Sequence, residues 1–194
     1  MRTIVLLRHG RTEANERRVY CGSSDLPLSE GGREELIRRR KAGAYPDIVG
    51  FRVYTSPLRR TEETLECLYG NVAYTVCPEL RESDFGVFEL RGFEEMKDDA
   101  DYIAWCSGDN WRNVPPGGES GETMARRVTE CFTRLRRQSG DLLLVTHGGP
   151  VAAIMCLLFP QEDRPFYRWL PKNGGGYIIM EEGEALSYRP IREE

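Results

Sequence analysis

The sequence predicts an α/β fold with three layers, in which a mostly parallel central sheet carries helices on both faces and gains an antiparallel C-terminal addition. Two observations predict this class. Short apolar runs typical of strands alternate with longer segments of helical spacing, which is the pattern of chains that build parallel sheets. The last run is followed by a turn signal at Glu182 and Gly183, which predicts a hairpin from Tyr177 to Ile191. The strand-like runs are residues 3–7, 51–55, 72–76, 142–146 and 177–180.

Start and stop signals place helices between these runs. Ser56 and Pro57 follow the second run and fit the N-cap and the first position of a helix that continues to about Tyr69. Residues 119–138 keep apolar side chains at helical spacing, and Pro150 fits an early position of a later helix. Helices of this length can connect neighbouring parallel strands and cover the sheet.

Residues 84–118 form the least regular stretch, rich in aromatic residues and ending in a Pro/Gly turn. A long excursion from an α/β sheet can be a packed elaboration or a lid that sets specificity, and both interpretations remain open. No repeat, linker or shift in composition divides the chain. Residues 1–194 are therefore predicted to form a single domain.

The composition indicates a globular protein without a general affinity for polyanions or lipid. The net charge is −4 at pH 7, and no apolar run approaches a membrane span or a signal-peptide core. We therefore expect a cytoplasmic protein that binds neither nucleic acid nor membranes. The six cysteines are scattered without zinc-site spacing, which predicts reduced thiols. The cationic run 38–41 is predicted to be a solvated helix face.

The two histidines of the chain occupy equivalent places. His9 and His147 each follow an apolar strand and precede a glycine. Because the carboxyl ends of parallel strands meet at one edge of a doubly wound sheet, we expect the two imidazoles to share a crevice. Gly10 and Gly148 would let backbone N–H groups approach an anion there. Either histidine alone fits a structural role, but the pair predicts a functional site.

Six short blocks follow one another along the chain. They are Arg8-His9-Gly10 with Thr12 and Asn15, Asp25 to Glu30, Ser56 to Thr61, Leu80-Arg81-Glu82 with Phe85-Gly86 and Phe88-Glu89, Pro116 to Ser120, and Thr146 to Gly149. In these blocks and their order the chain resembles the histidine phosphatase, or phosphoglycerate mutase-like, superfamily over nearly its whole length. The resemblance implies the phosphoglycerate mutase-like fold and a phosphate site.

The resemblance implies that His9 is the nucleophile and forms a phosphohistidine. Arg8 and Arg60 would neutralise phosphoryl oxygens and lower the pKa of His9, which keeps a lone pair on the imidazole. Asn15 would add a neutral donor, and His147 would donate to the developing charge.

Glu82 is the general acid that the resemblance implies, and it would return as the base that activates water. A carboxyl group beside phosphate oxygens is expected to have a raised pKa. Taken alone, Glu82 is more typical of a solvated surface glutamate, and its place in the block Leu80-Arg81-Glu82 with Phe85-Gly86 reverses that interpretation. The neighbouring Glu89 is the first residue to test as a substitute, and Gly148 is expected to bind phosphate beside His147.

The resemblance implies a metal-independent phosphomonoesterase that hydrolyses a small phosphorylated metabolite without a cofactor. Ala14 stands where cofactor-dependent phosphoglycerate mutases usually carry Trp, which favours the compact phosphatase branch. Residues 102–111 and the following PPGGES resemble alpha-ribazole phosphatases and imply alpha-ribazole 5′-phosphate as substrate. Leu90, where the family more often has Gly, is a departure that leaves the path of the lid open.

Three alternatives remain open. The first is a cofactor-dependent phosphoglycerate mutase, and the second is a catalytically inactive binding module of the same fold. The third is a metal-dependent phosphoesterase, although two histidines without a carboxylate cluster make a poor ligand set. The sequence leaves the oligomeric state undefined, with a homo-oligomer among the options.

Overall fold

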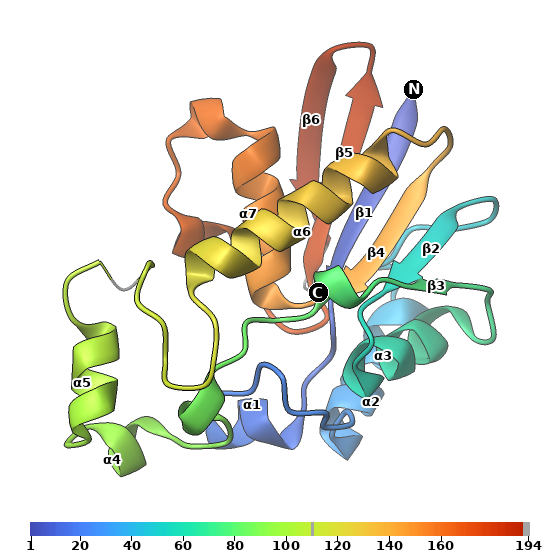
Figure 1. The fold of residues 1–194 in the computed structure, drawn as a ribbon. Coiled ribbons are helices and arrows are strands. Elements are labelled where there is room, and N and C mark those ends of the chain that lie inside the picture. The colour runs from blue at the N-terminus through green and yellow to red at the C-terminus, as the bar shows by residue number, and fades with distance from the viewer. Residues whose placement is uncertain (110, 192–194) are drawn as a thin grey trace.

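The computed structural model describes residues 1–109 and 111–191 of the chain. Figure 1 shows strands and helices alternating along most of it. The strands are β1 (Arg2–Arg8), β2 (Arg52–Thr55), β3 (Thr75–Val76), β4 (Leu142–Thr146), β5 (Gly176–Glu182) and β6 (Ala185–Pro190). The α-helices are α1 (Glu13–Arg17), α2 (Glu30–Lys41), α3 (Arg59–Tyr69), α4 (Phe93–Met96), α5 (Ala100–Cys106), α6 (Gly121–Arg136) and α7 (Gly148–Leu158). The 3₁₀ helices are η1 (Pro78–Leu80), η2 (Gly86–Phe88), η3 (Pro160–Glu162) and η4 (Phe166–Trp169).

The described strands form one sheet in the order β3-β2-β4-β1-β5-β6. β1, β2, β3 and β4 run parallel, whereas β5 pairs antiparallel with β1 and β6 antiparallel with β5. This confirms the predicted fold class and the C-terminal hairpin. β4 lies between β1 and β2, so the chain leaves β1 and returns beside it more than a hundred residues later. That crossover makes the ends of β1 and β4 neighbours.

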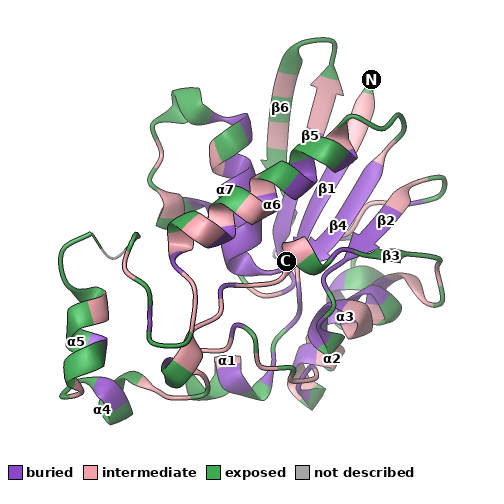
Figure 2. Ribbon diagram, in the orientation of Figure 1, coloured by how far each residue is buried: buried purple, intermediate pink, exposed green. Residues whose placement is uncertain are grey.

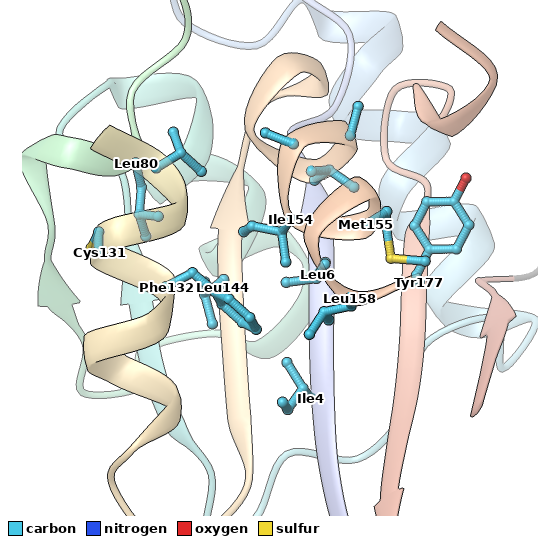
Figure 3. Close-up of a cluster of buried hydrophobic side chains, with 14 of the residues drawn as sticks. Ile4, Leu6, Leu80, Cys131, Phe132, Leu144, Ile154, Met155, Leu158 and Tyr177 are labelled. Carbon is cyan, nitrogen blue, oxygen red and sulfur yellow. The ribbon is translucent and has the colours of Figure 1, made fainter. Parts of the chain in front are cut away.

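The core has two layers because alternate side chains of β1 point to opposite faces of the sheet. Ile4 and Leu6 pack with residues of α6 and α7 on one face, as Figure 3 shows. Val5 and Leu7 pack on the other face with residues of α2 and α3. All four side chains are fully buried. A strand covered on both faces needs an unbroken apolar run, which explains the sequence of β1.

Helix α3 begins later than the sequence predicts. Ser56 and Pro57 precede it, and Leu58 takes the N-cap position without a side-chain cap bond. Ser56 is fully buried, and its hydroxyl group lies 2.7 Å from His147 Nε2. The N-cap prediction was therefore wrong, since this hydroxyl is used for a tertiary contact instead. The predicted end of the helix at Tyr69 is confirmed.

Two further predictions were wrong in part. The run 72–76 contributes only the two residues of β3 to the sheet, because Val72 packs against the core beside α3 instead of joining the ladder. The run 38–41 is not a uniformly solvated face, because Arg39 is 4% exposed and donates to the carbonyl of Asn173 at 3.2 Å. A guanidinium on a long stem can reach buried carbonyl groups that helical periodicity does not reveal.

The excursion over residues 84–118 builds a small core of its own. Figure 1 shows α4 and α5 in a lobe away from the sheet and near α1, and Figure 2 shows that α5 is largely exposed on its outer side. Most aromatic side chains of this lobe contact one another. The buried cluster consists of Phe88, Met96 and Tyr102, and Phe85 and Trp105 of the lobe pack against it together with Tyr20. These rings are therefore committed to packing within the lobe.

None of the described helices has both the length and the apolar character needed to cross a membrane.

Candidate functional site

The sheet brings the two histidines together. Arg8 and Thr146 are opposite one another in the parallel pair of β1 and β4, and the His9 N–H continues the ladder by donating to Thr146 O at 2.9 Å. The rings of His9 and His147 lie edge to face with their centroids 5.1 Å apart. Both residues are buried, and the two imidazoles lie together at the strand ends, as expected.

His9 is held in one tautomer. Its Nδ1 lies 2.7 Å from the carbonyl oxygen of Gly10. Because a carbonyl oxygen only accepts hydrogen bonds, Nδ1 carries the hydrogen and Nε2 keeps its lone pair. Burial, followed by the charges of Arg60 and Arg8, holds the pKa of His9 well below its usual range. The imidazole is therefore neutral at physiological pH, which is the form that can attack phosphorus.

Arg60 is a fully buried cation near both rings. Its terminal nitrogens Nη1 and Nη2 donate to the carbonyl oxygens of Ser24 and Gly22, each at 2.7 Å. Its Nε donates to Nδ1 of His147 at 3.3 Å. Burial lowers the pKa of Arg60, while Cys21 and the surrounding carboxylates oppose the shift. A buried guanidinium aligned in this way is a strong partner for phosphoryl oxygens.

Both ring nitrogens of His147 have partners within the protein. Nδ1 accepts from Arg60, so Nε2 carries the hydrogen and donates to Ser56 Oγ at 2.7 Å. Burial and the nearby Arg60 charge hold the pKa of His147 well below its usual range. Donation from His147 to a phosphoryl group stays a prediction, and it would use the hydrogen that Ser56 now accepts. Sequence reasoning missed Ser56, although it lies in the same block as Arg60.

Arg8 lies beneath the start of α7. Its Nη1 donates to Pro171 O at 2.8 Å, and its buried Nε has no partner among the described residues. A side chain at Gly148 would come within 3.4 Å of this guanidinium, so glycine leaves room above Arg8. Burial lowers the pKa of Arg8, and Glu82 opposes that shift. The free donor and the helix start are consistent with the predicted phosphate clamp.

Asn15 is tied into the start of α1. Its Oδ1 accepts from the N–H and hydroxyl groups of Thr12, both at 3.0 Å, and from Nδ2 of Asn173 at 3.1 Å. The carbonyl end of the Asn15 amide is thus structural, and only its amino end is left for the predicted donation to phosphate. Asn173 also donates to the carbonyl oxygen of His9 at 3.4 Å, a contact that no sequence motif indicated.

Glu82 lies beside the second histidine block. Its Oε2 accepts from the Gly149 N–H, and its Oε1 from the Ser83 N–H, both at 3.0 Å. A side chain at Gly149 would collide with the carboxylate, so only glycine allows this approach. Glu82 interacts electrostatically with Arg8 and Arg60, which places the proposed acid near both phosphate clamps.

Arg127 on α6 fixes the backbone that carries Glu82. Its guanidinium donates to the carbonyl oxygens of Glu79 and Arg81, each at 2.7 Å, and to that of Glu82 at 2.8 Å. Its Nε also donates to Glu119 Oε2 at 3.1 Å. Arg127 was not identified from the sequence. The only sequence feature that could have indicated it is its position next to the apolar face of a predicted helix.

Replacement of Arg127 by methionine is expected to lower the free energy of unfolding by about 3 kcal/mol or more. The variant leaves the Glu119 carboxylate largely buried without its cation, and three carbonyl groups lose their donor. Urea unfolding measures the change. Arg126→Met, on the exposed side of the same helix, is the matched control and is expected to stay within about 0.5 kcal/mol of the parent. Equal stabilities of the two variants would contradict this account of Arg127.

The described residues contain no group of three or more His, Cys, Asp or Glu side chains that could hold a metal ion.

Comparisons with known proteins show which proteins the chain resembles. The chain is 33% identical over 178 residues to the adenosylcobalamin/alpha-ribazole phosphatase of Salmonella typhimurium, covering 87% of this chain and 85% of that protein. It is 34% identical over 170 residues to a 2,3-bisphosphoglycerate-dependent phosphoglycerate mutase of Methylobacterium radiotolerans, covering 81% and 79%. The crystal structure of the alpha-ribazole phosphatase from Shigella flexneri superposes with a TM-score of 0.83 at 26% identity, covering 97% and 95%.

The profile of the histidine phosphatase superfamily (branch 1) matches residues 4–189, from the first core residue of β1 into β6. All six sequence blocks fall within that range. The chain therefore belongs to the histidine phosphatase superfamily.

Proposed function

We propose that the protein is a phosphomonoesterase that transfers the phosphoryl group of a small metabolite to His9 and then to water. The observation that carries this proposal is the state of His9, a buried neutral imidazole whose Nδ1 hydrogen is bound to Gly10 O. Its remaining lone pair lies on Nε2, in the field of Arg8 and Arg60. That combination provides a nucleophilic nitrogen close to two cations that can bind phosphoryl oxygens.

In the first step Nε2 of His9 attacks phosphorus, and the bond between phosphorus and the leaving oxygen breaks. The new phosphohistidine is positively charged on the ring, and the Nδ1 hydrogen bond to Gly10 O stabilises that charge. Arg8 and Arg60 offset the charge that spreads over the phosphoryl oxygens. Glu82, in its protonated form, gives its proton to the departing oxygen.

In the second step water attacks the phosphohistidine. The Glu82 carboxylate formed in the first step takes a proton from that water, and the bond between phosphorus and Nε2 breaks. His9 returns to its neutral form and inorganic phosphate leaves. The hydrogen bonds from Gly149 and Ser83 hold the Glu82 carboxylate in place between the two steps.

Alpha-ribazole 5′-phosphate is the substrate that we propose, on the strength of the relatives named above. A surface pocket of about 510 Å³ adjoins Arg8, and neither His9 nor Glu82 lines it. It is lined by Arg8, Arg11, Glu35, Leu170, Pro171, Lys172 and Asn173. The aromatic residues of the excursion are a weaker source of stacking contacts, since most pack on one another or on Tyr20 and Trp111 packs on Phe166.

A phosphate-release screen tests the proposal. It compares alpha-ribazole 5′-phosphate with 3-phosphoglycerate and fructose bisphosphates, and follows phosphoglycerate isomerisation primed with 2,3-bisphosphoglycerate. We expect hydrolysis to exceed isomerisation and alpha-ribazole 5′-phosphate to have the highest kcat/KM. Isomerisation that outpaces hydrolysis would favour the mutase alternative, for which the similarity to the Methylobacterium enzyme is the supporting observation.

The pH dependence of hydrolysis tests the role of Arg60. Its positive charge lowers the pKa of His9 by opposing protonation, so Arg60→Met is expected to raise that pKa. Because only neutral His9 attacks, the acid limb of kcat/KM should move to higher pH, and kcat at neutral pH should fall by about 10²-fold or more. The measurement is kcat/KM for p-nitrophenyl phosphate from about pH 4 to pH 8.

The control for this experiment is Arg59→Met, which removes an exposed charge one residue away on α3. It should leave the acid limb in place. An Arg60→Met enzyme with the acid limb of the parent would show that Arg60 does not set the charge state of His9.

A further inference from the structure

The carboxylate of Glu89 is unusually well supplied with donors. Its Oε1 accepts from the N–H groups of Gly22, Ser23 and Phe85 at 3.0, 2.9 and 3.1 Å. Its Oε2 accepts from the N–H groups of Gly22 and Ser24 at 3.1 and 3.2 Å and from Ser24 Oγ at 2.7 Å. The backbone N–H groups of three successive residues, 22–24, therefore all donate to the side chain of Glu89, which lies near the start of the excursion.

Two of these residues also bind Arg60 through their carbonyl groups. Gly22 O and Ser24 O each accept from the Arg60 guanidinium at 2.7 Å. The segment 22–24 thus lies between an anion and a cation, with three N–H groups bound to Glu89 and the carbonyl groups of Gly22 and Ser24 bound to Arg60. This is the arrangement expected if the carboxylate sets the path of the loop and the loop sets the direction of the guanidinium.

The loop has little freedom to shift. A side chain at Gly22 would collide with the carbonyl oxygen of Ser83, so the backbone of the loop rests directly on the segment that carries Glu82. Ser23 adds a second anchor by donating from Oγ to Asp84 Oδ1 at 3.0 Å. A displacement of this loop would therefore act on Arg60 through its two carbonyl partners, whereas the Glu82 carboxylate keeps its own donors, the N–H groups of Gly149 and Ser83.

We propose that Glu89 is a positioning residue, which orients Arg60 for phosphoryl transfer through the backbone of residues 22–24. This inference rests on the proposed function. The sequence suggests Glu89 as a substitute for the general acid Glu82, and the inference gives Glu89 a different role. Both oxygens of Glu89 accept hydrogen bonds from the loop and from Phe85. Glu89 itself need not touch the substrate.

This position needs a side chain with two oxygens that both accept hydrogen bonds. Each of the five donors points a hydrogen at an oxygen, and an amide group would turn one of its own N–H donors toward them. Glu89→Gln keeps the size of the side chain, but the new amide NH₂ group faces backbone N–H groups that also donate, so these hydrogen bonds are lost. The loop must then move, and Arg60 loses one or both of its carbonyl partners.

The test compares Glu89→Gln with the parent enzyme in three measurements: kcat for p-nitrophenyl phosphate, inhibition by orthovanadate, and the dependence of kcat/KM on the leaving group. We expect kcat to fall by about 10²-fold and orthovanadate inhibition to weaken by about 10-fold or more, because Arg60 no longer meets the equatorial oxygens. The leaving-group dependence should stay that of the parent, since Glu82 keeps its role.

Glu95→Gln is the matched control. Glu95 belongs to the same excursion, and its Oε1 accepts from the Gly92 N–H at 3.3 Å without contacting the loop 22–24. It should stay within about twofold of the parent in all three measurements. A folded Glu89→Gln enzyme with the kcat and orthovanadate inhibition of the parent would overturn the inference.

A milder variant keeps the proposal testable if Glu89→Gln fails to fold. Ser24→Ala removes only the 2.7 Å hydroxyl contact with Glu89 and should weaken orthovanadate inhibition by about threefold; no change would contradict the inference. Failure of the proposed function has a different signature. A parent enzyme that neither hydrolyses p-nitrophenyl phosphate nor binds orthovanadate would refute the function and, with it, this role of Glu89.

Discussion

Replacement of His9 by alanine is expected to lower phosphate release by at least about 10⁴-fold and to abolish an acid-labile phosphoenzyme. The reason is that no other neutral imidazole nitrogen is free nearby, since both nitrogens of His147 are engaged with Arg60 and Ser56. The phosphoenzyme is measured by rapid acid-free quenching of enzyme mixed with labelled substrate, and phosphate release by a continuous assay.

His9→Asn is the sharper variant of this experiment. Its amide nitrogen can replace Nδ1 as the donor to Gly10 O, so the local hydrogen bond is kept while the nucleophilic nitrogen is lost. We expect it to be as inactive as His9→Ala but closer to the parent in stability and in orthovanadate binding. Activity retained in either variant would exclude the phosphohistidine route. A catalytically inactive binding module would be indifferent to both substitutions.

Replacement of Glu82 by glutamine is expected to separate the two steps of the reaction. With a poor leaving group such as an alkyl phosphate, kcat/KM should fall by about 10³-fold, because the departing oxygen receives no proton. With p-nitrophenyl phosphate the first step needs no acid, whereas the second still lacks its base. The phosphoenzyme should therefore accumulate and appear as a burst of nitrophenol in rapid mixing.

Glu79→Gln is the control for that experiment. Glu79 lies in η1, three residues before Glu82, and its partly exposed carboxylate pairs with Arg134 at 2.9 Å. The control should show neither the loss with alkyl phosphates nor the burst. An equal loss with both kinds of leaving group, and no burst, would show that Glu82 does not act as the proton donor and base.

The sequence predicted the fold because its signals are strong and local. The apolar run of β1, buried on both faces, and the alternation of strands and helices leave few other arrangements. Local predictions were wrong where a side chain that looked like a local signal makes a tertiary contact instead. Ser56 looked like an N-cap, but its hydroxyl bonds to His147, and α3 begins three residues later. Arg39 looked solvated, but it is buried and its guanidinium donates to the carbonyl of Asn173.

The sequence by itself predicted the reacting groups that we propose. The two histidines follow from their place at strand ends, and the arginines and the glutamate follow from the resemblance of their blocks to the family; both are properties of short segments. Only the tertiary structure decided which nitrogen of His9 is free, that Ser56 bonds to the ring of His147, and that Arg127 and Glu89 bond to distant backbone groups. These hydrogen bonds of Ser56, Arg127 and Glu89 join residues dozens of positions apart in the sequence. Many side chains of suitable length can make such bonds, so residue type and spacing do not predict them. They form only because the fold brings distant loops together.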